Sequence, residues 1–250
     1  MMIISVARGA VTILASVVLE DLFSHFGEGL EEDEFVQSTA IVMSIRLPRI
    51  LMAIMVGATL AVCGATLQGL FRNPLADPQL IGVSAGAALG AAFTIILGGA
   101  ITSAVPFLEG VNLIPFAAFA GGLAATILVY KISAINGKTS VSTMLLAGIA
   151  VNALVAAGIG YLVFSADDNQ IRDLTFWTLG TLNGSTWSSF YSVLPFMLVS
   201  ILILPFLSKQ INIILIGENE ARYLGVNVER LKKLVILLAA LGVGASVAVT

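Results

Sequence analysis

Charged residues are scarce in this chain, and their scarcity excludes the ordinary soluble proteins. Only 11% of the 250 residues are Asp, Glu, Lys or Arg, whereas 58% are hydrophobic and the mean hydropathy is +1.02. A soluble protein of this size needs far more charged surface, so the composition indicates an integral membrane protein. The formal net charge of -3 gives no reason to expect a nucleic-acid partner.

Cysteine and histidine occur once each. Cys63 lies within an apolar run, and a single thiol excludes an internal disulfide and argues against a cysteine-ligated metal cluster. His25 lies near the outer end of the first apolar segment, where an interfacial role is more typical than metal binding. We therefore expect no metal site and no bound cofactor in this chain.

Ionisable residues are missing from the middle of every long apolar segment. Proton- and sodium-coupled carriers usually need such groups, or dense coordinating groups, at the centre of the membrane. The sequence also has no P-loop and no HExxH motif, so it supports neither nucleotide hydrolysis nor zinc proteolysis. We expect a chain that is not an enzyme, and the energy for any uphill transport would come from another subunit.

Long apolar segments are what the chain has in abundance. Each of seven is long enough to cross a hydrocarbon core of ~30 Å as a helix. They are approximately Met1–Leu19, Leu47–Phe71, Gln79–Ile101, Leu113–Ile132, Val141–Phe164, Trp187–Leu207 and Leu231–Thr250. The sequence therefore predicts an all-α polytopic membrane protein, with residues 1–250 forming a single transmembrane domain.

Two shorter signals refine this prediction. Acidic Glu20 and Asp21 follow the first segment where a signal peptide would have a small-residue cleavage site, so we expect a retained helix; a cleaved signal is the alternative. Residues 167–185 predict a short surface helix and a turn at Asn183-Gly184.

Lysine and arginine are distributed unevenly between the predicted loops. With a cytoplasmic N-terminus, nine of the twelve lie on the inside, and only Arg46, Arg49 and Arg172 lie outside. This split satisfies the positive-inside rule and predicts that orientation. Arg46 and Arg49 flank Pro48 at the outer end of the second segment. They either anchor the helix at the interface or, as an exposed pair of cations, bind carboxylates of an external partner.

Small residues recur at helical spacing in three segments. In the third segment they are Gly82, Gly86 and Gly90, and in the second they are Gly57, Ala61, Gly64 and Ala65. Such residues let helices approach closely in lipid, so we expect them at helix–helix contacts. The fifth segment has a more polar stripe of Gly148, Asn152, Ala156 and Gly160. It predicts either part of a translocation path or, for Asn152, a hydrogen bond that bridges two helices.

The predicted cytoplasmic loop at residues 209–233 carries apolar residues among its charges. They are Leu215, Ile216, Tyr223, Leu224 and Val226. Exposed apolar residues rimmed by charge commonly mark a protein contact, which a merely solvated loop would not need. Within the loop we expect a short helix that is capped by Asn219, begins at Glu220 and ends at Gly225, with Ala221 and Leu224 on one face.

Several blocks of this sequence match one known family in the same order. They are RLPR at 46–49, GATLAVCGATLQGLFRNPLADPQLIGVSAGAALG at 57–90, SVSTMLLAGIAVNA at 140–153, IRDLTFWTLGTLNG at 171–184 and GENEARYLGVNVER at 217–230. Together they resemble the permease subunits of bacterial ABC importers for iron-siderophore complexes, heme and vitamin B12. The resemblance covers nearly the whole chain.

The resemblance implies an all-helical permease of about ten helices that pairs with a second permease subunit, identical or not, around a central path. A cytoplasmic ATPase dimer would hold ATP and Mg²⁺, and an external binding protein that brings the substrate would dock through carboxylates of its two lobes on Arg46 and Arg49. The residues implied at the ATPase contact are Gly217, Glu218, Ala221, Arg222, Leu224 and Gly225. Those implied near the cytoplasmic gate and along the path are Ser140, Ser142, Gly148, Asn152 and Ala156.

The resemblance also implies the bacterial cytoplasmic membrane and, as the commonest family substrate, a ferric siderophore; heme and cobalamin are the alternatives. The match ends at Thr250, where family members continue with about three more helices, so we expect an incomplete permease. Two other hypotheses stay open. One is a stand-alone channel or carrier, which the uncharged helix centres disfavour, and the other is an inactive membrane fragment.

Overall fold

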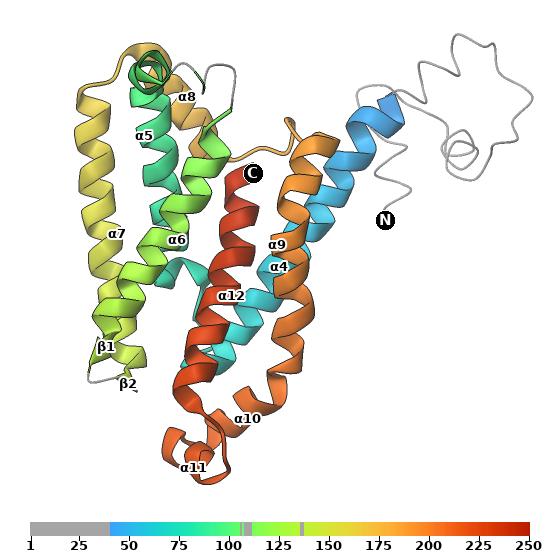
Figure 1. The fold of residues 1–250 in the computed structure, drawn as a ribbon, viewed down its shortest axis with the longest axis vertical. Coiled ribbons are helices and arrows are strands. Elements are labelled where there is room, and N and C mark those ends of the chain that lie inside the picture. The colour runs from blue at the N-terminus through green and yellow to red at the C-terminus, as the bar shows by residue number, and fades with distance from the viewer. Residues whose placement is uncertain (1–40, 106, 108–111, 136–137) are drawn as a thin grey trace, which may run out of the picture. The chain divides into compact units, whose positions relative to one another are not determined.

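The computed structural model describes residues 41–105, 107, 112–135 and 138–250. They form two compact units, residues 41–55 with 182–194 and residues 56–181 with 195–250. Six helices in this part of the chain are long and apolar enough to cross a membrane (Figure 1). The prediction of an all-α polytopic protein is therefore confirmed. The predicted helix at Met1–Leu19 lies outside the described residues.

The smaller unit contains the start of α4 (Leu47–Phe71), whose bounds are the predicted ones. A π-helical turn, η1 (Val42–Arg46), leads directly into this helix. Pro48 follows the π turn, and its ring nitrogen has no hydrogen to donate to the carbonyl four residues earlier. A single π-helical turn of this kind typically appears as a bulge within a longer α-helix. The helical run therefore begins earlier than predicted, and Arg46 lies within it.

The start of α9 (Trp187–Phe206) completes the smaller unit. It follows a turn at residues 182–184, which confirms the predicted turn at Asn183-Gly184. The indole Nε1 of Trp187 donates to the Met43 carbonyl at 2.8 Å. This hydrogen bond satisfies the one polar group of the indole and joins the two helix starts.

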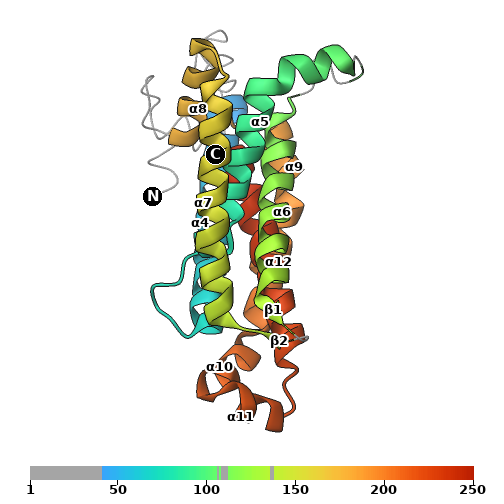
Figure 2. The same cartoon turned by 90° about the vertical axis from the view of Figure 1, so that its left-hand side faces the viewer.

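Four long helices form the core of the larger unit. They are α5 (Val83–Ala104), α6 (Ile114–Ser133), α7 (Val141–Phe164) and α12 (Val228–Val249). Helices α5 and α6 each contact the other three, and Figure 2 shows α5, α6 and α7 side by side. The predicted bounds of α7 are exact, and those of α6 and α12 differ by one to three residues.

Glycine allows α5 and α6 to approach backbone to backbone. A Cβ atom on Gly86 would overlap the Gly121 carbonyl, and one on Gly90 would overlap the Ala117 carbonyl. The predicted packing role of Gly86 and Gly90 is thus confirmed. Gly57 and Gly64 differ, because a Cβ on either would meet no described atom within 4 Å. The predicted packing role of Gly57 and Gly64 stays a prediction.

The predicted helix at residues 79–101 is interrupted near its start. A 3₁₀ helix, η2 (Pro78–Ile81), is capped by Asp77, whose carboxylate accepts the Gln79 N–H at 2.7 Å. It ends at Gly82, which has φ +81, and α5 begins after it. The left-handed conformation at Gly82 breaks the helix and is tolerated there because glycine has no Cβ. Gly82 therefore ends a turn, and a Cβ placed on it would be in ordinary contact with Val129 and Ala125 of α6.

The short surface helix predicted within residues 167–185 is α8 (Asp168–Leu179). Asp167 caps it by accepting the Asn169 and Gln170 N–H groups at 2.9 Å, and the Gln170 side chain accepts the Asp167 N–H at 3.1 Å. This capping box fixes where the helix begins. Gln170 also donates to the Ile96 carbonyl at 3.1 Å, which attaches α8 to α5.

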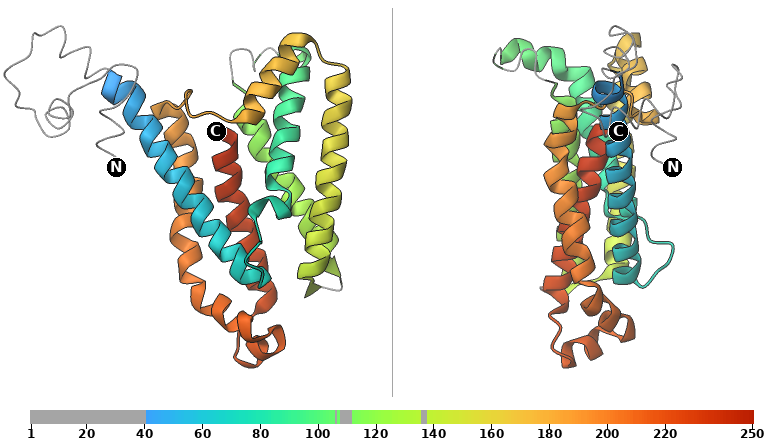
Figure 3. Two further views of the ribbon diagram at one scale, coloured as in Figure 1. Left: turned by 180° about the vertical axis from the view of Figure 1, so that it is seen from behind. Right: turned by 90° about the vertical axis from the view of Figure 1, so that its right-hand side faces the viewer.

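Short elements gather at the end of the larger unit where α6 ends and α7 begins. Strands β1 (Ala134–Ile135) and β2 (Lys138–Thr139) pair antiparallel between α6 and α7. Helices α10 (Ser208–Ile216) and α11 (Glu218–Tyr223) precede α12. Figure 3 shows α10 and α11 at the end of the unit where α12 begins, and the connection from α4 to η2 is at this end too.

Candidate functional site

Helix α11 begins at Glu218, two residues earlier than predicted. Asn219 is therefore an exposed residue inside the helix, and its predicted capping role is wrong. The start is set by a tertiary contact that the local sequence does not reveal, since the Glu218 carboxylate pairs with Lys232 of α12. A carboxylate in the first turn also suits the positive end of the helix.

The end of α11 follows from the local sequence. Gly225 has φ +84, and its N–H donates to the Arg222 carbonyl at 3.0 Å. The next N–H, of Val226, donates to the Ala221 carbonyl at 2.9 Å. These two bonds are those of a Schellman motif, which places a left-handed residue, usually glycine, after the helix. The predicted end at Gly225 is confirmed.

An exposed apolar patch covers the surface of α10 and α11. Its residues and exposed fractions are Leu215 (49%), Ile216 (70%), Tyr223 (91%) and Leu224 (63%). This confirms the predicted exposure for all but Val226, which is half-buried against the core. Ala221 is fully buried, so the prediction that it shares an exposed face with Leu224 is wrong. Leu224 lies in the turn after the helix, where the turn and not the helical period decides its direction.

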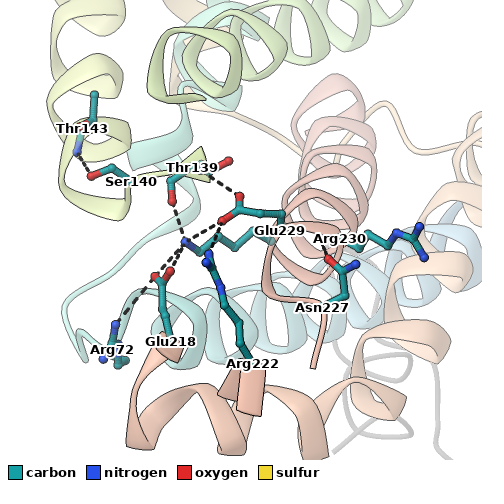
Figure 4. A network of polar contacts seen from close by, with 10 residues as sticks. Arg72, Thr139, Ser140, Thr143, Glu218, Arg222, Asn227, Glu229 and Arg230 are labelled. Carbon is teal, nitrogen blue, oxygen red and sulfur yellow. Dashed lines mark hydrogen bonds and ion pairs between the residues drawn. The ribbon is translucent and has the colours of Figure 1, made fainter. Parts of the chain in front are cut away.

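The ammonium of Lys232 on α12 has acceptors on three elements, and Figure 4 shows the three residues that supply them, Thr139, Glu218 and Glu229. Only 2% of the Lys232 side chain is exposed. Its Nζ lies 2.8 Å from both carboxylate oxygens of Glu218 and 2.6 Å from the Thr139 carbonyl, and it is 3.9 Å from Glu229. An ammonium can be buried only when its charge and its donors find partners, and these contacts supply both.

Glu229 makes a second group of polar contacts next to those of Lys232. Its Oε2 accepts the Thr139 N–H at 2.8 Å, and its Oε1 lies 3.3 Å from Nη2 of Arg222 on α11. Thr139 therefore has both backbone groups held by side chains of α12, the N–H by Glu229 and the carbonyl by Lys232. The Arg72 guanidinium, at the end of α4, completes the set at 3.8 Å from Glu218. We refer to Arg72, Thr139, Glu218, Arg222, Glu229 and Lys232 as the polar network.

The polar network is directly continuous with the start of α7. Ser140, the residue after Thr139, is the N-cap of that helix, and its Oγ accepts the Thr143 N–H at 3.3 Å. Ser142 follows in the first turn and is exposed. Two of the residues implied for a gate thus lie one and three positions beyond the network.

Sequence reasoning assigned Glu218 and Arg222 to a partner contact, but both are paired within the chain. It missed Lys232, Glu229 and Thr139 altogether. One signal was available: Lys232 lies inside the last apolar segment, where an unpaired ammonium would be costly. Its acceptors lie in distant parts of the sequence and only the fold brings them together.

Arg46 and Arg49 are half-buried rather than exposed. Nη2 of Arg49 donates to the Asn183 carbonyl at 3.2 Å, across the smaller unit. Both alternatives for Arg46 and Arg49, an interfacial anchor and a contact with an external partner, stay predictions. The planar guanidinium of Arg49 still has further donors on its fork.

The small-residue stripe on α7 divides into two parts. A Cβ on Gly148 would overlap the Leu80 carbonyl, and Asn152 Nδ2 donates to the Gln79 carbonyl at 3.4 Å. Both residues therefore face η2, which supports the bridging alternative for Asn152. Ala156 and Gly160 are exposed.

An apolar groove of about 840 Å³ opens between α5, α6 and α7. Its lining on α7 consists of Val151, Leu154, Val155, Ala157 and Gly158. None of the residues predicted for the path belongs to this lining. The groove and the predicted path are therefore different surfaces of the same helix.

Comparison with known proteins shows to which family this chain belongs. The sequence model of the FecCD transport family matches residues 1–250. The chain belongs to this family. The resemblance drawn from its sequence blocks is thereby confirmed.

Individual members of the FecCD family are similar over most of this chain. The cobalamin import system permease protein BtuC of Halobacterium salinarum is 42% identical over 83% of the chain, and the hemin transport system permease protein HmuU of Yersinia pestis is 40% identical over 83%. The iron(3+)-hydroxamate import system permease protein FhuG of Bacillus subtilis is 32% identical over 91%. The chain spans 53%, 61% and 66% of these three relatives, respectively.

A solved structure has the same fold. An inward-facing ABC transporter of the metal-chelate type superimposes with a TM-score of 0.80 and 28% sequence identity. The match covers 99% of this chain and 71% of that one. The arrangement of helices in this FecCD chain is thus that of a polytopic ABC transporter subunit.

Proposed function

We propose that this FecCD chain acts as a permease subunit of an ATP-driven importer for a metal chelate, with a ferric siderophore as the first candidate. The observation that carries the proposal is the exposed apolar patch on α10 and α11. An ATP-driven importer whose membrane subunit has no nucleotide-binding motif needs a partner to hydrolyse ATP, and this patch has the character of a protein contact. Membership in the family supports the same assignment.

In this proposal the end that carries α11 is cytoplasmic, the N-terminus is on the same side, and the membrane is the bacterial inner membrane. The excess of lysine and arginine in the corresponding loops supports this orientation. An ATPase dimer docks on the apolar patch, a second permease subunit pairs with this one, and a binding protein docks outside near Arg46 and Arg49.

In the proposed mechanism, a separate ATPase switches the paired permeases between two conformational states. ATP binding closes the ATPase dimer and displaces α11. The paired permeases then alternate between outward-open and inward-open states, and the substrate passes between them. The uncharged helix centres support a path that binds the substrate weakly, so that selection is made mainly by the external binding protein.

Uptake measurements test the assignment and the substrate together. A strain lacking the gene would be supplied with radiolabelled ferric siderophore, hemin or cobalamin, and complemented with this chain or with the reading frame continued through any downstream sequence. We expect ATPase-dependent rescue of ferric siderophore uptake. Rescue with hemin or cobalamin instead would correct the substrate, as the relatives described for those two compounds make plausible.

The same assay separates the other hypotheses. Uptake that persists without the partner ATPase and responds to ion gradients would indicate a channel or carrier. Rescue by the longer form alone would show that residues 1–250 are not sufficient for transport. Rescue by neither form, with both present in the membrane, would contradict the importer assignment.

A further inference from the structure

We propose that Lys232 and Glu229 are positioning residues that transmit displacement of α11 to the N-terminus of α7. The inference rests on the proposed function, because it explains how an ATPase docked at the apolar patch would move the implied gate residues. It adds a mechanical connection, made of named side chains, between the coupling element and the gate.

The first half of the connection joins α11 to α12. Glu218 and Arg222 lie one helical turn apart on α11, and each pairs with a residue of α12. Lys232 binds Glu218 with 2.8 Å contacts, and Glu229 binds Arg222 at 3.3 Å. Glu229 and Lys232 are themselves three residues apart on one face of α12. In one pair the acid is on α11 and the base on α12, and in the other pair the reverse holds. Together the two pairs fix both the position and the rotation of α11.

The second half joins α12 to α7. Lys232 holds the Thr139 carbonyl at 2.6 Å, and Glu229 holds the Thr139 N–H at 2.8 Å. Both contacts involve an ionised side chain, and such charge-assisted hydrogen bonds are stronger than neutral ones. Because they act on the backbone, they fix the chain one residue before Ser140, the N-cap of α7. The connection from α12 to α7 therefore does not depend on the side chains of the implied gate residues Ser140 and Ser142.

Burial makes this connection stiff. Lys232 is 2% exposed and Thr139 is 4% exposed, so water cannot readily replace either contact. Separating α11 from β2 would deprive the buried ammonium of either the Glu218 carboxylate or the Thr139 carbonyl, which is unfavourable. A force applied to α11 is therefore expected to move β2 and the first turn of α7 with it.

Distance measurements in the assembled transporter test this directly. Spin labels would be placed at exposed Lys138 on β2 and exposed Asn219 on α11, outside the apolar patch, with Cys63 replaced by alanine, in the complex with the partner ATPase. We expect one narrow distance distribution that stays the same with and without ATP. In Lys232→Met the distribution should broaden or shift between the two states. The matched control is Lys233→Met, which removes the neighbouring exposed lysine. Its distance distribution should equal that of the protein with an intact polar network, with and without ATP.

Import per ATP hydrolysed gives the functional readout. For Lys232→Met we expect this ratio to fall by about tenfold, within the range of typical coupling between two sites, while the ATPase still co-purifies. Glu218→Gln, a milder change that keeps the shape of the side chain, should reduce the ratio in the same direction. It keeps the test decisive if Lys232→Met does not fold.

The outcomes separate this inference from the proposed function. If the unmodified complex imports substrate and the two network variants keep its ratio and its distance distribution, the inference is overturned and the function stands. Loss of ATPase binding in Lys232→Met or Glu218→Gln would show that the network only shapes the docking surface, which also overturns transmission. Absence of ATP-driven import by the unmodified complex would count against the proposed function itself.

Discussion

Gly148 and Gly160 lie on the same helix and belong to the same stripe in the sequence, but their surroundings differ. A Cβ on Gly148 would overlap the Leu80 carbonyl, whereas one on Gly160 would meet no described atom within 4 Å. The composition of the stripe indicates that close approach is possible along its whole length. Which glycine is actually approached depends on where η2 crosses α7, and this is a property of the fold.

We expect Gly148→Ala to destabilise the protein by about 1–3 kcal/mol, because the added methyl group forces α7 away from η2. Gly160→Ala is the matched control, and there the greater helix propensity of alanine should leave stability unchanged or raise it by up to ~1 kcal/mol. Thermal unfolding of the purified protein in detergent measures both. Equal stability of the two variants would contradict the contact between Gly148 and Leu80.

At the scale of elements, α11 combines an inner polar side with an outer apolar side. Its polar residues Glu218 and Arg222 pair with α12, and Ala221 is buried below them. Tyr223 and Leu224 remain exposed. A helix of six residues cannot be stable by itself, so these tertiary contacts and the Schellman ending maintain it. The result is a rigid support that presents two large apolar side chains.

Leu224→Asp should weaken binding of the partner ATPase by about tenfold or more without affecting membrane insertion. The change removes the burial of one leucine at the interface, worth ~2 kcal/mol, and places a carboxylate there. Asn219→Asp introduces the same charge at another exposed position of α11 and is the control. Co-purification and the amount of protein in the membrane are the measurements. An ATPase that binds Leu224→Asp normally would exclude Leu224 from the contact.

At the scale of the whole molecule, the sequence indicates contacts on both sides of the membrane. The apolar patch on α10 and α11 suits an ATPase, and Arg46 and Arg49, which the positive-inside rule predicts on the outer side, suit an acidic partner. Arg49 also stabilises the smaller unit through Asn183. A substitution of Arg49 would therefore change this structural contact in addition to the charge offered to a partner.

Replacing Arg46 and Arg49 by Glu should weaken docking of the external binding protein on the order of tenfold at low ionic strength, with a smaller effect at high salt. Arg172→Glu reverses a third arginine of the same predicted outer side, one that is exposed, and is the control. Affinity measured as a function of salt concentration checks this. A salt-independent loss would instead point to disruption of the contact between Arg49 and Asn183.

Periodicity and length gave reliable positions for most helices. The bounds of α4 and α7 agree with prediction to the residue, since a membrane span must be long and continuously apolar, and this is visible without a fold. The break at Gly82 was missed because an apolar glycine in an apolar run gives no local sign of its left-handed conformation. Cap and turn residues near Gly225 and Asn183 were found because their local chemistry determines the backbone.

The sequence alone determined the class of protein, the presence of each described span and most of its limits, four exposed apolar residues of the loop and the family. All of these depend on composition and short-range pattern, which the chain carries locally. Only the tertiary structure decided that Lys232 is buried, that Glu218 and Glu229 surround it, and that Thr139 joins this network to α7. Those contacts connect residues 72, 139, 218 and 232, and only the packing of helices brings such distant positions within hydrogen-bonding distance.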